Sequence, residues 1–238
     1  MSKTIHVRML GEFVVEVDGQ ETLNLISKTR KGAALMIYLV LNNGKWVPKQ
    51  RLLNTLWSVF QTTNPESALK TLISRLRKTL NEIHEGLGEC IESGKGGYRW
   101  QNLPHMKTDI LELIERFNAI PRETDQEKRL MLHQQVRKIY HGDLCLAGDF
   151  TGGVEYATTL HNQFLRSVYD EIDLLKKKES FNEIAQICQD VLRIDALDDR
   201  IHLERMKARI KCHGRWNTCR SGKRIYGCRA FLYSFKAR

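Results

Sequence analysis

A thirteen-residue segment, Ala68 to Leu80 (ALKTLISRLRKTL), constrains the fold of this chain more than any other part of it. Its large apolar side chains recur at intervals of three and four residues, the period of an amphipathic α-helix. They are Leu69, Leu72, Ile73, Leu76 and Leu80. The opposite side carries hydroxyl groups and cations and no acid: Thr71, Ser74 and Lys78, flanked by Lys70, Arg75 and Arg77. Such a face suits a groove lined by phosphates and base edges. The alternative is an ordinary solvated basic face.

The segment before this helix predicts a small antiparallel sheet. Ile5, Val7 and Met9 alternate with polar residues, which is the period of a strand. A second apolar run, Phe13 to Val17, ends at Asp18-Gly19, a strong turn dipeptide. Leu23 and Leu25 indicate a short third strand.

Two further helices are expected between this sheet and the basic helix. The period of three and four predicts one over Lys28–Leu41 and a second over Gln50–Trp57, with Trp46-Val47 as a short extended piece between them. Ser58–Asn64 is expected to be a loop. Pro65 then favours the start of the basic helix, which we expect to run to about Glu85. The second and third helices would form a helix-turn-helix.

A glycine-rich turn follows the basic helix. Ile91–Ser93 and Tyr98–Trp100 are short runs joined by Gly94–Gly97, which predicts a β-hairpin placed to act as a wing. We reject a phosphate-binding loop at these glycines, because the Gly-Lys-Ser/Thr ending is missing and no helix follows.

The second half of the chain has a helical pattern. Its predicted helices cover Thr108–Ala119, Leu130–Tyr140, Glu155–Lys177, Phe181–Ile194 and Arg200–Lys211. Phe181 and Trp216 stand 35 residues apart, and an aromatic residue recurring near this period is typical of tetratricopeptide repeats. Asp198-Asp199 is expected to cap the helix that follows. The predicted fold is therefore an α+β N-terminal winged helix-turn-helix followed by an all-α tetratricopeptide-like helical domain.

The charge of the chain is unevenly distributed. The net charge is +10, but residues 105–210 hold 16 basic and 19 acidic residues, while residues 211–238 hold 8 basic residues and no acid. The overall basicity is therefore weak support for nucleic-acid binding, and the local pattern of the basic helix carries the prediction. We expect the basic tail, residues 217–238, to be poorly ordered and to leave apolar surface on the preceding helix uncovered. Non-specific binding to nucleic acid or to anionic lipid is the alternative for this tail.

The six cysteines form no CxxC pair, and a disulfide framework is not expected in a chain of this size without a leader. Cys212, His213, Cys219 and Cys228 match no common zinc spacing, so we expect no metal and no cofactor. No nucleophile elbow, HExxH motif or Walker loop is present, which argues against an enzyme. No apolar run is long enough to span a membrane and no signal peptide is evident, so a cytoplasmic location is expected.

Residues 5 to about 100 resemble the winged-helix effector domain of OmpR-type regulators. The resemblance rests on the three leading strands, on LLNTLW (Leu52–Trp57), on ALKTLISRLRKTL, and on the closing GKGGYRW (Gly94–Trp100). It implies that the Ala68–Leu80 helix enters the DNA major groove and that the hairpin touches the neighbouring minor groove or backbone. It also implies that the loop Ser58–Asn64 corresponds to a segment that can touch RNA polymerase.

The order of domains resembles the SARP group of bacterial transcriptional activators, whose second part is the bacterial transcriptional activation domain. YHGDLCLAGDF (Tyr140–Phe150) is similar to the entry segment of that domain, and RIDALDDRIHLERMKARIKCHGRW (Arg193–Trp216) is similar to one of its repeats. The resemblance implies a domain of residues 1–104 that binds DNA and an incomplete helical domain of residues 105–216. Relatives of this type bind direct repeats side by side, which implies a dimer on DNA.

The predicted function is sequence-specific binding of promoter DNA by an activator that contacts RNA polymerase, with no membrane partner. The groove contacts are expected from Ser67, Lys70, Thr71, Ser74, Arg75 and Lys78. The phosphate contacts are expected from Lys49, Arg51, Lys95 and Arg99, whereas Arg77 lies nearer the apolar stripe and is a candidate for a structural role. The alternative is a helical-repeat scaffold whose winged helix contacts proteins rather than specific DNA.

Overall fold

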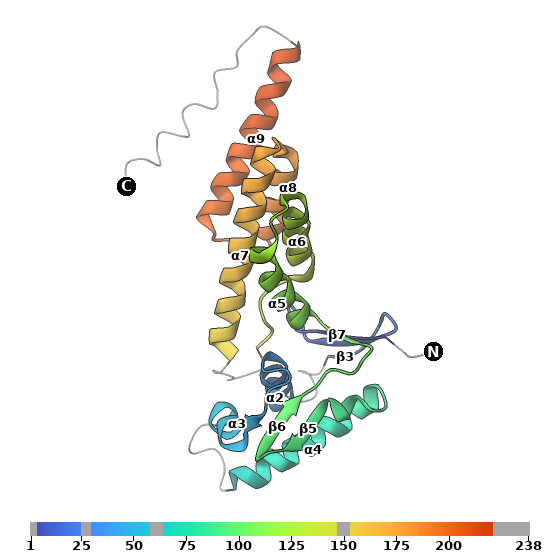
Figure 1. Cartoon of the computed structure of the whole chain (residues 1–238). Coiled ribbons are helices and arrows are strands. Elements are labelled where there is room, and N and C mark those ends of the chain that lie inside the picture. Colours follow the sequence, from blue (N-terminus) through green and yellow to red (C-terminus); the bar gives the residue numbers. More distant parts are fainter. Residues whose placement is uncertain (1–3, 25–29, 58–63, 147–152, 221–238) are drawn as a thin grey trace. The chain divides into compact units, whose positions relative to one another are not determined.

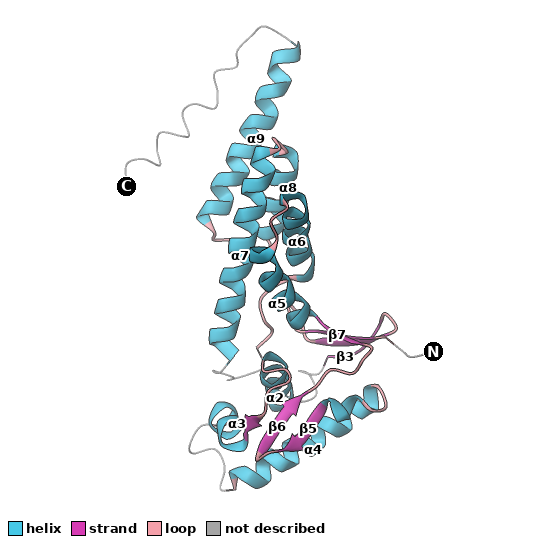
Figure 2. Ribbon diagram, viewed as in Figure 1, coloured by secondary structure: helices cyan, strands magenta, loops and turns pink. Residues whose placement is uncertain are grey.

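The computed structural model describes residues 4–24, 30–57, 64–146 and 153–220, with the backbone alone for residues 22–24 and 213–220. The chain divides into two compact units, residues 1–168 and 169–238, and the boundary lies inside helix α7 (Val154–Lys177). The first unit contains both sheets and most of the helices (Figure 1). The described part of the second unit is helical apart from its connecting turns (Figure 2).

The first unit begins with a four-stranded sheet in the order β3-β2-β1-β7. Strands β1 (Ile5–Arg8), β2 (Val14–Val17) and β3 (Gln20–Asn24) form the predicted antiparallel sheet, with Asp18-Gly19 in the turn. The fourth strand, β7 (Met106–Thr108), pairs parallel to β1 and was not predicted. It lies inside the segment that was expected to be all helical, so the α-helical part begins one strand later than expected.

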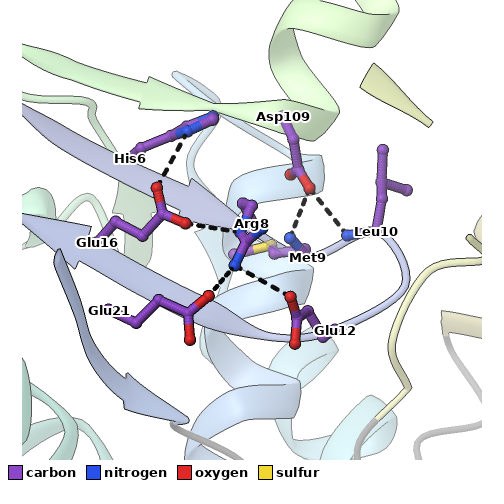
Figure 3. A network of polar contacts seen from close by, with 8 residues as sticks. All are labelled: His6, Arg8, Met9, Leu10, Glu12, Glu16, Glu21 and Asp109. Carbon is purple, nitrogen blue, oxygen red and sulfur yellow. Dashed lines mark hydrogen bonds and ion pairs between the residues drawn. The ribbon is translucent and has the colours of Figure 1, made fainter. Parts of the chain in front are cut away.

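The carboxylate of Asp109 fastens the start of helix α5 (Asp109–Ala119) to the end of β1 (Figure 3). One oxygen accepts hydrogen bonds from the backbone N–H groups of Met9 and Leu10 at 2.7 and 2.9 Å. The side chain is 3% exposed, and this burial raises the pKa of Asp109 although the backbone bonds oppose the rise. On β1 itself, Arg8 forms ion pairs with Glu12, Glu16 and Glu21.

Helix α2 (Arg30–Leu41) lies at the centre of the first unit. Residues 32–40 are all buried, as expected for a helix that is apolar on every side. It contacts α3 (Lys49–Leu56), α4 (Pro65–Ile83), α5 and strand β6 (Gly97–Trp100). The apolar stripe of α4 therefore has a fixed surface to pack against, and this determines which side of α4 remains exposed.

The remaining elements of the first unit are a second sheet, two 3-10 turns, helix α6 and the first part of α7. A three-stranded sheet has the order β4-β6-β5, with β4 at Val47–Pro48 and β5 at Ile91–Gly94, and a 3-10 turn at Leu87–Cys90 leads into it. A second 3-10 turn at Ile120–Arg122 precedes α6 (Gln126–Ile139). Helix α6 starts four residues before the predicted Leu130, because Asp125 caps it and its first turn is polar, so no apolar period marks that turn.

The second unit packs the end of α7 with α8 (Phe181–Val191) and α9 (Asp199–Arg220). Its buried side chains include Ile172, Ile184, Ile187 and Ile201. Asp198 accepts a hydrogen bond from the Ile201 N–H at 2.8 Å, which confirms the predicted cap of α9. The backbone of α9 continues nine residues past the predicted end at Lys211. The prediction stopped there because the apolar period in the sequence ends at that point. Residues 221–238 of the basic tail lie outside the described residues.

Candidate nucleic-acid interface

Helix α4 presents one buried and one exposed side. Asn64 caps its N-terminus by accepting a hydrogen bond from the Ser67 N–H at 3.1 Å, and Pro65 occupies the first turn as predicted. Four members of the predicted stripe are buried, namely Leu69, Ile73, Leu76 and Leu80, whereas Leu72 is half-buried. The apolar stripe thus fixes the rotation of the helix about its axis.

The exposed side of α4 carries every groove residue predicted from the sequence. Ser67, Lys70, Thr71, Ser74, Arg75 and Lys78 are all exposed, and we call these six residues the recognition face. In the described part of the chain, none of its three cations is in an ion pair with an acid. Their charge is therefore available to a ligand, and hydroxyl and guanidinium groups supply donors suited to phosphates and base edges.

Arg77 is turned away from the recognition face. Its Nε and Nη2 donate to the backbone carbonyl of Ile91 at 3.2 and 2.5 Å, and Nη2 also donates to the Ser93 hydroxyl at 2.8 Å. Both acceptors belong to β5, so Arg77 fastens the first strand of the hairpin to α4. The geometry gives Arg77 the structural role for which it was a candidate, and it sets the spacing between α4 and the hairpin.

The hairpin β5-β6 has the form predicted for a wing. Lys95 and Gly96 form its two-residue turn with positive φ angles of 44° and 73°, the conformation of a type I′ turn. The backbone of Gly97 lies against β4, where a Cβ would come within 2.0 Å of the Val47 carbonyl oxygen. The Lys49 N–H donates to the Gly96 carbonyl at 3.2 Å, which ties the start of α3 to the wing turn.

The four residues predicted to contact phosphate are in different environments. Arg51 and Lys95 are exposed, whereas Lys49 and Arg99 are half-buried. Arg99 is paired with Glu92 on the neighbouring strand, with Nε and Nη2 at 2.7 and 2.6 Å from one carboxylate oxygen. All four lie on α3 or on the wing; α3 contacts α4, and Arg77 bonds α4 to the wing strand β5.

The role of Trp46 was not predicted from the sequence. Its indole ring lies under two cations of the wing, 6.0 Å from Lys95 Nζ and 4.7 Å from the Arg99 guanidinium carbon, measured to the ring centroid. These are distances of a cation–π contact. The register that pairs Val47 with Tyr98 makes Trp46 a neighbour of Arg99, and this pairing of distant segments is known from the structure and not from a local sequence pattern. The predicted loop contact with RNA polymerase, Ser58–Asn64, lies outside the described residues except for Asn64.

The cysteines and metal candidates add no second site in the described part of the chain. Cys90, Cys145, Cys188 and Cys212 are free thiols, and burial raises the pKa of Cys90 and of Cys188 to about 11. Among the residues described, no group of three or more His, Cys, Asp or Glu is placed to hold a metal ion. Of the tail cluster, only Cys212 has a described side chain. Within the same ranges no helix is long and apolar enough to cross a membrane.

Comparison with known proteins supports this view of the N-terminal part. Residues 21–100 match the family model described as "Transcriptional regulatory protein, C terminal". A solved structure of Mycobacterium tuberculosis EmbR in complex with a low-affinity phosphopeptide is similar, with a TM-score of 0.71 and 16% sequence identity. The similarity covers 89% of this chain and 56% of that chain, so this chain spans little more than half of EmbR. No curated protein matches.

These matches confirm the expected fold, an OmpR-type winged helix followed by a mostly helical region. Residues 21–100 are thus similar to the C-terminal domain of transcriptional regulatory proteins. The likeness to EmbR, at this identity, concerns the fold alone.

Proposed function

We propose that this chain binds promoter DNA sequence-specifically and that α4 is its recognition helix. The recognition face carries the proposal, because it presents three hydroxyl groups and three cations that are in no ion pair, on a helix whose other side is buried. In helix-turn-helix proteins the later helix enters the major groove while the earlier helix crosses the backbone. Helix α3 occupies the position of that earlier helix.

Within the recognition face we assign Arg75 to base readout. Arginine can donate two hydrogen bonds to guanine, and a good pair of this kind is worth about 1–3 kcal/mol of discrimination. Thr71 and Ser74 lie on the same face and can bind either base edges or phosphates. Ser67, Lys70 and Lys78 lie farther along the helix in both directions and complete the groove contacts.

Lys49, Arg51, Lys95 and Arg99 are proposed to bind phosphates, Arg99 only when its guanidinium group is released from Glu92. Such contacts are independent of sequence and make binding dependent on salt. They fix the register of the protein on the duplex, whereas the recognition face selects the sequence.

We further propose that the protein is a cytoplasmic activator. It would bind direct repeats as a dimer and contact RNA polymerase. The resemblance to SARP-type regulators supports this, together with the helical region that follows the winged helix. The proposed domains are residues 1–104, which bind DNA, 105–216, an incomplete activation domain, and a basic tail at 217–238. The proposal includes no enzymatic activity and no cofactor.

A helical-repeat scaffold is the second candidate, and one observation favours it. On α9, Leu203, Met206 and Ile210 are 38%, 48% and 42% exposed and recur at helical spacing. Side chains of this kind can bind a protein partner. A scaffold would use this surface and would not distinguish one DNA sequence from another.

Selection of bound sites from random duplex DNA by the full chain, followed by gel-shift titration over a salt series, tests the proposal. A selected sequence and a steep salt dependence are expected of a regulator. Equal binding to the selected and to scrambled duplexes, or no binding to either, would contradict it and favour the scaffold.

A further inference from the structure

Three side chains form a row across one face of the three-stranded sheet β4-β6-β5. The strand order β4-β6-β5 places Trp46 beside Arg99 and Arg99 beside Glu92. Glu92 and Arg99 are direct cross-strand partners, and their bonds of 2.7 and 2.6 Å join two guanidinium nitrogens to one carboxylate oxygen. The Trp46 ring supports the guanidinium at 4.7 Å from its centroid. Arg99 is thus held from two sides by neighbours in its own sheet.

This row distinguishes the two cations of the wing. Lys95 lies at the tip, is exposed, and has no acid paired with it among the described residues. The charge of Arg99 is balanced by Glu92, and both side chains retain only about a third of their exposure, at 31% and 36%. Carboxylate and phosphate bind the same donors of a guanidinium group. A DNA phosphate that approaches Arg99 therefore competes with Glu92 for the same nitrogens.

We propose that Glu92 limits the affinity of the wing for the DNA backbone by holding Arg99 out of contact with phosphate. This inference rests on the proposed function, and it deepens that function by naming a residue that sets the strength and salt dependence of binding. Lys95 supplies the phosphate contact of the wing in the resting arrangement, and Arg99 supplies a second one only when Glu92 releases it. Because phosphate contacts carry no sequence information, Glu92 affects all duplexes alike.

The test compares Glu92→Gln with Glu89→Gln in the full chain, by titration of the selected duplex and a scrambled duplex between 50 and 200 mM salt. Both variants remove one negative charge close to the wing. Glu89 is exposed and in no ion pair within the described ranges, so it controls for the general change in charge. We expect Glu92→Gln to steepen the salt dependence by about 0.9 for one added phosphate contact. Its gain in affinity should therefore grow about 3.5-fold from 200 to 50 mM salt.

The same gain is expected on both duplexes, which would leave the preference for the selected sequence unchanged. Glu89→Gln is expected to leave the salt slope at the wild-type value. The double variant Glu92→Gln/Arg99→Gln should return to the wild-type slope, because the added contact needs the guanidinium. Thermal unfolding of each variant, followed by circular dichroism, verifies that the wing fold is retained.

Two results would overturn the inference while the proposed function stands: an unchanged slope for Glu92→Gln, or a steeper slope that persists in the double variant. The second result would mean that removal of the negative charge, and not release of Arg99, strengthens binding. If the wild-type chain binds no duplex at all, the proposed function fails, and this inference fails with it.

Discussion

Helices α4 and α9 are both long and basic, yet their apolar and charged side chains lie in different environments. On α4 the principal apolar residues are buried at 0–3% exposure, and the charged side is left to solvent. On α9 three apolar residues remain 38–48% exposed, and one of its cations, Lys207, is paired with Glu204 at 3.0 Å. A basic helix thus becomes a candidate for DNA recognition where its apolar side is covered and its exposed cations are in no ion pair.

The largest expected difference between the two helices concerns stability. Leu76 on α4 is fully buried, so Leu76→Ala should lower the free energy of unfolding by about 2–5 kcal/mol through lost burial and the cavity left behind. Met206 on α9 is 48% exposed, and Met206→Ala should change it by less than about 0.5 kcal/mol. Urea unfolding followed by circular dichroism measures both. Equal losses would show that the face of α9 is covered in solution.

The next largest effect concerns specificity. Arg75→Ala should reduce the preference for the selected duplex over a scrambled one by about 1–3 kcal/mol, because a bidentate contact to guanine is lost. Arg209 is an exposed arginine on α9 and serves as the matched control, since Arg209→Ala removes the same charge. Competition gel shifts with the two duplexes measure the preference. If Arg75→Ala and Arg209→Ala lower it equally, or neither does, Arg75 is not a base-reading residue.

A third test compares the response to acid of one buried carboxylate in each unit. Burial raises the pKa of Asp109 in the first unit. Burial also favours a higher pKa for Glu204 in the second unit, but bonds from Lys176 and Lys207 at 2.8 and 3.0 Å outweigh it, so the pKa of Glu204 is lowered. The stabilisation from Glu204 is complete above its ordinary pKa of 4.5 and is lost as the pH falls through its lower folded-state value.

Asp109 has the opposite pH dependence. Its contribution to stability is complete below its ordinary pKa of 3.8 and is lost as the pH rises through the higher folded-state pKa. Acidification from pH 6 to pH 3.5 should therefore weaken α8 and α9 more than β1 and the start of α5. Hydrogen exchange corrected for intrinsic rates measures this for each segment, and Glu204→Gln should remove the excess loss in α8 and α9. Equal loss of protection in the two regions of the wild type would show that these two carboxylates do not determine the difference in acid response between them.

The same comparison shows which features could be predicted from sequence. The buried stripe and recognition face of α4 follow from the period of Leu69, Ile73, Leu76 and Leu80, because the helix carries its whole pattern within one segment. The Glu92–Arg99 pair was equally predictable, since the two-residue turn at Lys95-Gly96 fixes the strand register. It was missed because each residue was considered separately.

Other features depend on contacts between distant segments and have no local pattern. Strand β7 is three residues long and pairs with β1 about a hundred residues earlier, so its alternation is too short to detect. The place of Arg77 near the apolar stripe made it a candidate for a structural role, but only the position of the Ile91 carbonyl shows that it fastens the wing. The extension of α9 past Lys211 carries no apolar stripe and was missed for that reason.

The smallest expected effect compares two lysines that each lie over an aromatic ring. Lys95 Nζ is 6.0 Å from the Trp46 ring centroid on the wing, and Lys211 Nζ is 4.5 Å from the Phe181 ring centroid in the second unit. Lys95→Ala should weaken binding to every duplex alike and make the salt dependence shallower by about 0.9, the change expected for one lost phosphate contact. Lys211→Ala removes the same charge and should leave the slope unchanged. Gel-shift titrations over a salt series measure both slopes. Equal slopes for the two variants would mean that position on the wing gives Lys95 no contact with DNA, and that net charge alone governs the salt dependence.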